Sequence, residues 1–76
     1  MVSPYDERYE QLVTRLRRAR TDAGLSQTEV ATKLGLTQPL VSRMEAGQRK
    51  IDPIELAVLC RVYGKSVRYF VPEMPT

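Results

Sequence analysis

The stretch LTQPLVSRME places polar side chains between apolar ones at helical spacing. Its polar or rigid members are Gln38, Pro39, Ser42 and Arg43. If this stretch is a helix, the apolar residues between them stack on one side and leave these four on the other. Forked hydrogen-bonding groups with small apolar contacts are what the base-pair edges in a DNA major groove require. These four residues are therefore candidates for reading a DNA sequence.

The sequence offers little for catalysis or metal binding. It has no His, one cysteine (Cys60) and no glycine-rich phosphate loop. We therefore expect no enzymatic activity, no metal site and no cofactor. Cys60 lies in an apolar run, and we interpret it as a small buried residue of a protein in a reducing compartment, the cytoplasm. The chain has neither a signal-peptide pattern nor an apolar run of about 18 residues, so we expect neither secretion nor a membrane span.

The size and charge of the chain limit what it can be. Its 76 residues allow one small domain with one core, which we place at residues 1–76 with a frayed tail at about 72–76. Hydrophobic residues make up 42% and charged residues 28%, a balance typical of folded globular chains. A formal net charge of +3 allows a polyanionic partner without requiring one.

Capping residues and glycines divide the chain into five predicted helices, and no segment alternates with the period of a strand. The sequence therefore predicts an all-α fold. The expected limits are Ser3-Pro4 to Gly24, Ser26 to Gly35, Thr37 to Glu45 or Ala46, Asp52-Pro53 to Gly64, and Ser66 to Pro72. The apolar stripe of the first helix comprises Tyr5, Tyr9, Leu12, Val13, Leu16, Ala19 and Ala23.

The second and third predicted helices have the layout of a helix-turn-helix at about residues 26–46, because both are short and a glycine lies between them. Ala31 is small enough for the two axes to cross closely, and Gly35 supplies the positive φ of the turn. Pro39 fits the first turn of the third helix, where amide groups have no intrahelical acceptor. The side that carries Gln38 and Arg43 is then left free.

The segment LSQTEVATKLGLTQPLVSRMEAGQRK resembles the helix-turn-helix domain of the lambda-repressor/Cro-like (XRE) transcriptional regulators. The likeness extends from about Leu12 to Val71 and includes the closing segment GKSVRYFV. It implies a compact five-helix lambda-repressor-like domain whose third helix reads the major groove of double-stranded DNA. We predict a repressor that acts as a homodimer on a palindromic operator.

The resemblance implies roles for individual residues. The positions that face base edges are matched by Gln38, Pro39, Ser42 and Arg43. Gln27 matches a position that either binds a phosphate or braces the first residue of the reading helix. Contacts with the DNA backbone are implied for Thr37, Arg49 and Lys50. Pro39 is uncommon at this position of the family. It cannot make forked hydrogen bonds to a base, but it can still pack against a thymine methyl group.

The family's small members pair through the last helix and the loop before it, which implies a dimer interface at Val67, Tyr69 and Val71. We expect Phe70 to face inward. Two departures from the family pattern lie in this region, because Lys65 stands where an apolar residue is common and Arg68 where an acidic one is frequent. Like charges would then meet near the dimer axis, and we expect a dimer that is weak in solution.

The resemblance also implies a partly buried ion pair between Arg20 and Glu45, which would link the first helix to the reading helix. Glu45 is then a structural residue. We interpret Arg15, Arg17 and Arg18 as an ordinary solvated helix face rather than as a patch for DNA.

A second functional interpretation is an antitoxin-type protein-interaction module that also binds its own promoter. It shares the reading helix but requires a second protein surface, for which the exposed tyrosines and arginines of the first helix are the only candidates. The sequence does not identify that protein partner.

Overall fold

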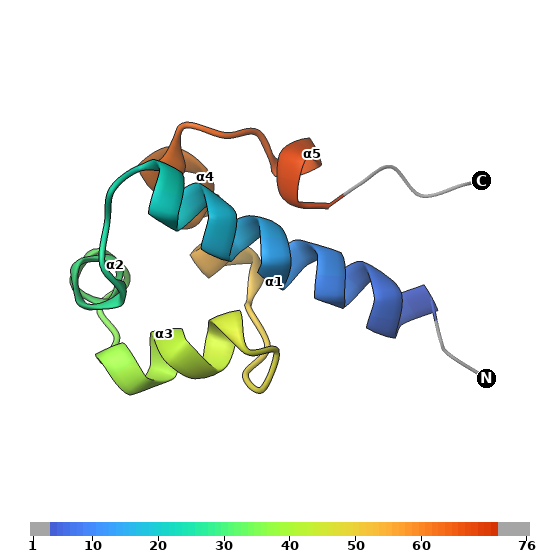
Figure 1. The fold of residues 1–76 in the computed structure, drawn as a ribbon, viewed down its shortest axis with the longest axis horizontal. Coiled ribbons are helices and arrows are strands. Elements are labelled where there is room, and N and C mark those ends of the chain that lie inside the picture. The colour runs from blue at the N-terminus through green and yellow to red at the C-terminus, as the bar shows by residue number, and fades with distance from the viewer. Residues whose placement is uncertain (1–3, 72–76) are drawn as a thin grey trace.

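The computed structural model describes residues 4–71, which contain five α-helices and no strand (Figure 1). These are α1 (Pro4–Asp22), α2 (Gln27–Leu34), α3 (Gln38–Glu45), α4 (Pro53–Tyr63) and α5 (Val67–Phe70). The predicted all-α fold and the order of its helices are confirmed. The predicted N-cap Ser3, the side chain of Tyr5, the terminating Pro72 and the tail at 72–76 lie outside the described part.

The buried face of α1 agrees with the predicted stripe over most of its length. Leu12, Leu16 and Ala19 are 9%, 1% and 2% exposed. Ala23 is exposed, so its assignment to the stripe was wrong. The helix ends at Asp22, and the chain then turns through Gly24 at a φ of 72°. Ala23 therefore no longer follows the helical period that would place it in the core.

Two capping boxes fix where α2 and α4 begin. At α2, the Glu29 amide donates to Ser26 Oγ (3.1 Å), and the Ser26 amide donates to Glu29 Oε1 (2.9 Å), as predicted. Asp52 and Glu55 make the same reciprocal pair at α4, with distances of 2.7 and 3.1 Å. Gly35 ends α2 in the left-handed region, with a φ of 69°. These caps satisfy amide groups that the helices leave without intrahelical acceptors.

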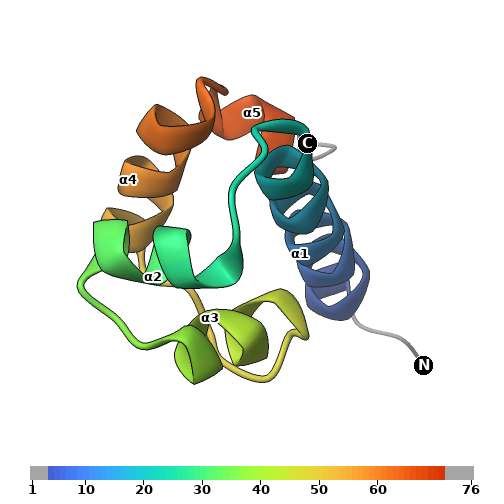
Figure 2. The ribbon, with the colours of Figure 1, turned by 60° about the vertical axis from the view of Figure 1, so that its left-hand side comes forward.

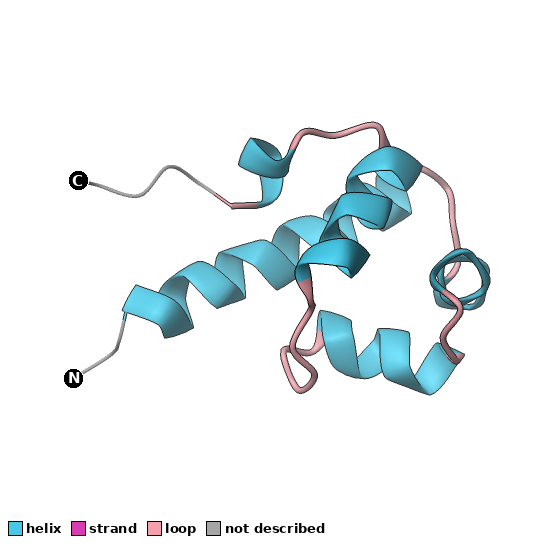
Figure 3. Cartoon of the chain, turned by 180° about the vertical axis from the view of Figure 1, so that it is seen from behind, coloured by secondary structure: helices cyan, strands magenta, loops and turns pink. Residues whose placement is uncertain are grey.

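The helices surround one core; in the view of Figure 1, α5 lies above α1 and α3 below it, and in Figure 2 both lie to the left of α1. Seen from behind, α4 crosses in front of α1 (Figure 3). The fully buried large side chains are Phe70, Leu16, Met44, Leu59, Val30 and Val41. Cys60 is half-buried on α4 and packs against this core, so its predicted burial is confirmed only in part. The burial it does have raises the pKa of its thiol.

Candidate nucleic-acid interface

The helix α3 has a buried side and an exposed side. Val41 and Met44 are each 1% exposed and anchor the helix in the core. The residues predicted to face bases lie away from this anchor, with three exposed and one half-buried: Gln38, Pro39, Arg43 and Ser42. Their helical spacing gathers them on one side. The fold thus presents the predicted reading surface to solvent.

The start of α3 has the expected form. Thr37 occupies the N-cap position in an extended conformation, and Pro39 lies in the first turn. The Thr37 hydroxyl makes no capping hydrogen bond, so its donor and acceptor groups are not used to hold the helix start. A cap residue with a spare hydroxyl can bind a phosphate at a helix N-terminus.

A chain of hydrogen bonds connects α1 with the exposed end of α3. Arg20 donates to both oxygens of Glu45, from Nε to Oε2 (2.7 Å) and from Nη2 to Oε1 (3.1 Å). Gln27 Nε2 also donates to Glu45 Oε1 (3.0 Å), and Gln38 Nε2 donates to Gln27 Oε1 (2.7 Å). The predicted Arg20–Glu45 pair is confirmed. Gln27 makes the bracing contact with the first residue of α3, one of the two roles that the resemblance implied.

The charged members of this chain are mostly shielded from solvent. The Glu45 side chain is 5% exposed and that of Arg20 is 14% exposed. The hydrogen bonds that Arg20 donates to Glu45 raise the pKa of its guanidinium. Burial, and to a smaller degree the negative charge of Glu45, raise the pKa of Tyr63 to about 12. The Arg20 guanidinium therefore stays charged and the Tyr63 phenol neutral at ordinary pH.

The loop between α3 and α4 is held from two sides. The Tyr9 hydroxyl donates to Arg49 O (3.2 Å) and accepts from the Ile51 amide (2.9 Å), which ties the loop backbone to α1. Arg49 forms a bidentate ion pair with Glu55, with both N–O distances at 2.9 Å. This pair raises the pKa of Arg49 and lowers that of Glu55. Of the two loop residues predicted to contact the DNA backbone, Arg49 is half-buried and Lys50 is exposed.

Sequence reasoning missed two residues that position this loop. The spacing of Asp52 and Glu55, which is that of a capping box, was the available signal for Glu55. For Tyr9 there was none, since its acceptor on Arg49 is 40 residues away along the chain.

Some of the predicted dimer residues are exposed, and one of them packs against side chains of its own chain. Val67 is 52% and Val71 37% exposed, whereas Phe70 is fully buried, as predicted. The half-buried Tyr69 packs edge-on against Phe70, with ring centroids 5.0 Å apart. Its ring contacts two cations of its own chain, those of Arg15 (5.7 Å) and Lys65 (4.8 Å). Arg15 Nη1 also donates a hydrogen bond to Tyr69 O (2.7 Å).

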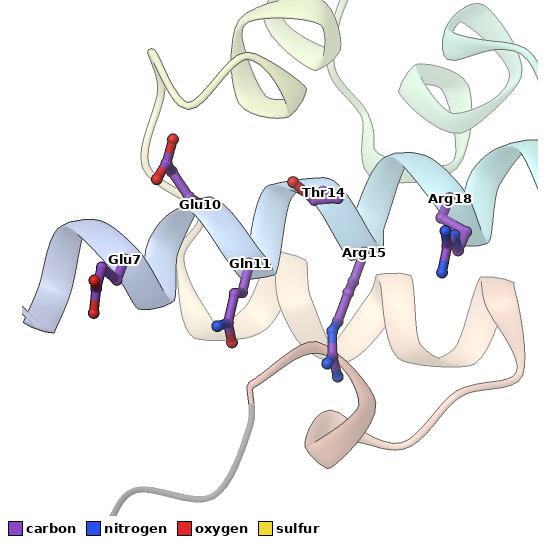
Figure 4. Close-up of a pocket in the computed structure, with 6 residues that line it drawn as sticks. All are labelled: Glu7, Glu10, Gln11, Thr14, Arg15 and Arg18. Atoms are coloured by element: carbon purple, nitrogen blue, oxygen red, sulfur yellow. The ribbon is translucent and has the colours of Figure 1, made fainter.

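The outer surface of α1 carries a shallow depression lined by Glu7, Glu10, Gln11, Thr14, Arg15 and Arg18 (Figure 4). Glu10 and Gln11 point away from each other, and Arg15 points toward α5. A catalytic site requires polar groups that converge on one point, and the groups of this depression do not. Residues 4–71 also contain no cluster of three or more metal-ligand side chains. No helix in the same part of the chain is long and apolar enough to cross a membrane.

The chain matches a known protein family. The model of the helix-turn-helix family HTH_3 matches residues 16–70, which is most of the chain. This range begins within α1 and ends with α5, so it includes the exposed side of α3 and the chain of hydrogen bonds behind it. No curated protein matches the chain.

Proposed function

The chain belongs to the lambda-repressor/Cro-like helix-turn-helix family, whose members bind double-stranded DNA and regulate transcription, and we propose that it is a homodimeric repressor of a palindromic operator. In this proposal α3 lies in the major groove, with Gln38, Pro39, Ser42 and Arg43 toward the bases. Thr37, Arg49 and Lys50 lie along the sugar-phosphate backbone, and Gln27 braces Gln38 at the start of the reading helix. The family is not one of enzymes.

The observation that carries the proposal is the exposed side of α3. Among residues 4–71 the Arg43 side chain has no hydrogen-bond or ion-pair partner, although other arginines of this fold, such as Arg20 and Arg49, are paired. A guanidinium with all its N–H groups available can bind guanine O6 and N7 in a bidentate manner. Gln38, which is also exposed on α3, is held in place by Gln27. A helix with this exposed side and a fully buried opposite side is suited to docking in a groove.

Selection of bound sites from a random duplex library tests the proposal. We expect enrichment of an inverted repeat whose half-sites are about 10–10.5 base pairs apart, center to center, since two-fold related modules bind one helical turn apart. The selection is repeated with proteins that co-purify from the host, to reveal any partner that changes the site. Failure to enrich any sequence over random duplex would contradict sequence-specific binding.

The loop after α3 should contribute to binding through phosphate contacts. We expect Lys50→Ala to weaken specific and non-specific binding alike and to flatten the dependence of log K on log salt by about one unit for each lost phosphate contact. Arg49→Ala should change the slope less, because its guanidinium is held by Glu55. The measurement is the affinity for operator and random duplex over a series of NaCl concentrations.

A matched control for this series is Arg18→Ala, which removes one positive charge on the part of α1 that faces away from α3 (Figure 4). Its salt slope should equal that of the unaltered protein. If Lys50→Ala also leaves the slope unchanged, the loop is not part of the DNA interface.

The homodimer rests on the amount of sequence that one reading helix can recognise. One α3 covers only a few base pairs, too few to be distinguished among the competing sites of a genome. The exposed Val67 and Val71, with the edge of Tyr69, are the proposed contact. In Figure 1, α5 lies at the upper edge of the fold and α3 at the lower edge, so pairing through α5 leaves the reading helices unobstructed.

We expect Val67→Asp and Tyr69→Asp to abolish pairing on DNA, because each places a carboxylate in the apolar contact. Sedimentation of the free protein should show a weak dimer, and footprinting of the variants should show protection of single half-sites at reduced affinity. Ile54→Asp is the control, since Ile54 is the most exposed large hydrophobic residue described (74%) but lies on α4. Pairing that survives both α5 changes would exclude this interface.

A further inference from the structure

The buried carboxylate of Glu45 constrains the amide group of Gln27. Both Glu45 oxygens accept hydrogen bonds from Arg20, whose guanidinium can only donate, which is the pattern of an ionised carboxylate. A carboxylate in that state can accept hydrogen bonds but not donate them. The group that Gln27 turns toward Glu45, at 3.0 Å, must therefore be its NH2 group. This assignment follows from the partner and does not depend on telling oxygen from nitrogen in the amide.

The constraint passes from Gln27 to Gln38. With its NH2 group toward Glu45, Gln27 presents its oxygen to Gln38, and Gln38 must donate an N–H to it (2.7 Å). Gln38 then has one remaining N–H and its carbonyl oxygen to offer to DNA. A donor and an acceptor side by side fit adenine, whose major-groove edge has the N7 acceptor and the N6 donor.

We propose that Glu45 is a specificity-determining residue that acts through Gln27: it fixes the polarity of the Gln38 amide and so makes Gln38 select adenine. The inference rests on the proposed function, in which α3 reads the major groove. Glu45 is 5% exposed and contributes without contact to DNA. It is thus a positioning residue for base recognition in addition to holding α1 against α3.

Reversing the polarity of the chain should reverse the base preference. Gln27→Lys places a group that can only donate between Glu45 and Gln38, and its ammonium can form an ion pair with Glu45. Gln38 must then turn its oxygen inward and offer its two N–H groups to DNA. Two donors fit guanine, which presents the O6 and N7 acceptors.

Glu45→Gln tests the carboxylate itself. The new side chain has one oxygen and one NH2 group, so one of the two Arg20 donors, Nε or Nη2, must lose its acceptor. The hydrogen bond from Nη2 is the longer of the two (3.1 Å against 2.7 Å), and its loss costs less. That choice turns an N–H toward Gln27, so that Gln27 and Gln38 both reverse. We expect the adenine preference to fall toward parity or below it.

The experiment measures affinities for two operator duplexes that differ only by adenine or guanine at the base pair whose preference disappears in Gln38→Ala. We expect the unaltered protein to prefer adenine roughly tenfold, within the range for one good bidentate contact. Gln27→Lys should prefer guanine. In a Gln38→Ala background, Glu45→Gln should leave the remaining adenine-to-guanine ratio unchanged, and the preference at the Arg43 base pair should persist in every variant that retains Arg43.

The outcomes separate the inference from the function it rests on. If Gln27→Lys and folded Glu45→Gln both keep the adenine preference while Gln38→Ala loses it, α3 still reads DNA and the role of Glu45 is wrong. If neither Gln38→Ala nor Arg43→Ala changes the selected sequence, the proposed function fails. Circular dichroism establishes whether each variant is folded. Gln27→Lys retains the Arg20–Glu45 pair. If Glu45→Gln does not fold, Gln27→Lys alone therefore still decides the question.

Discussion

Glu45→Ala is expected to lower the free energy of unfolding by as much as about 3–5 kcal/mol. This is the cost of breaking a fully buried ion pair, and it is an upper bound for the partly buried pair of Arg20 and Glu45. Truncation removes the acceptor of three hydrogen bonds, two from Arg20 and one from Gln27. It leaves the Arg20 guanidinium, whose side chain is 14% exposed, without its carboxylate. The loss should separate α1 from α3, which this pair joins.

Thermal and urea unfolding followed by circular dichroism measure the effect. Glu7→Ala is a suitable control, because Glu7 lies on the exposed surface of α1 and surface changes of this kind are usually within about 0.5 kcal/mol. Glu45→Ala should alter stability more than it alters the selected DNA sequence. A variant that unfolds at the same temperature as the unaltered protein but selects different bases throughout the site would show that the ion pair has no structural role.

Arg43→Ala is expected to reduce operator affinity by roughly 1–3 kcal/mol per half-site contact and to relax the preference for guanine at one base pair. The physical reason is the loss of a bidentate donor that has no hydrogen-bond or ion-pair partner within residues 4–71 and therefore breaks no such contact to bind a base. Gln38→Ala should have the same kind of effect at a neighbouring base pair.

Selection from the random library, performed with each variant, measures this change as a lost preference at a defined position. Affinity for random duplex should fall much less, because base contacts carry the sequence information and phosphate contacts the general affinity. Arg18→Ala again serves as the charge-matched control. If both α3 variants select the original site with the original affinity, α3 is not the reading helix.

Local signals in the sequence were sufficient to predict the helices. Ser26 with Glu29 and Gly35 act within a few residues of the chain, so the limits of α2 follow from them directly. The apolar stripe of α1 holds through Ala19 and fails at Ala23, where the helix has already ended. Periodicity identifies a buried side only while the helical conformation continues.

The site was predictable to different degrees. The periodicity around Val41 and Met44 was enough to place Gln38 and Arg43 on the exposed side of α3. The Arg20–Glu45 pair followed only from the resemblance, since 25 residues separate the two.

The ion pair that engages Arg49 could not be predicted from residue types. A basic residue in a loop next to the reading helix looks the same in the sequence whether its side chain faces a phosphate or Glu55. The same holds for Lys65, which departs from the family pattern and lies over the Tyr69 ring. In both cases the tertiary arrangement selects one of several available partners.

The hydroxyl of Tyr9 has a consequence for the energetics of association. By holding the backbone at Arg49 and Ile51, it orders the α3–α4 loop in the free protein. A segment that is disordered before binding loses conformational entropy when it binds, at about 1–2 kcal/mol for each residue fixed. In this chain that entropy is lost on folding, so the loop can meet a phosphate without a further ordering step, and encounter with DNA approaches rigid-body docking.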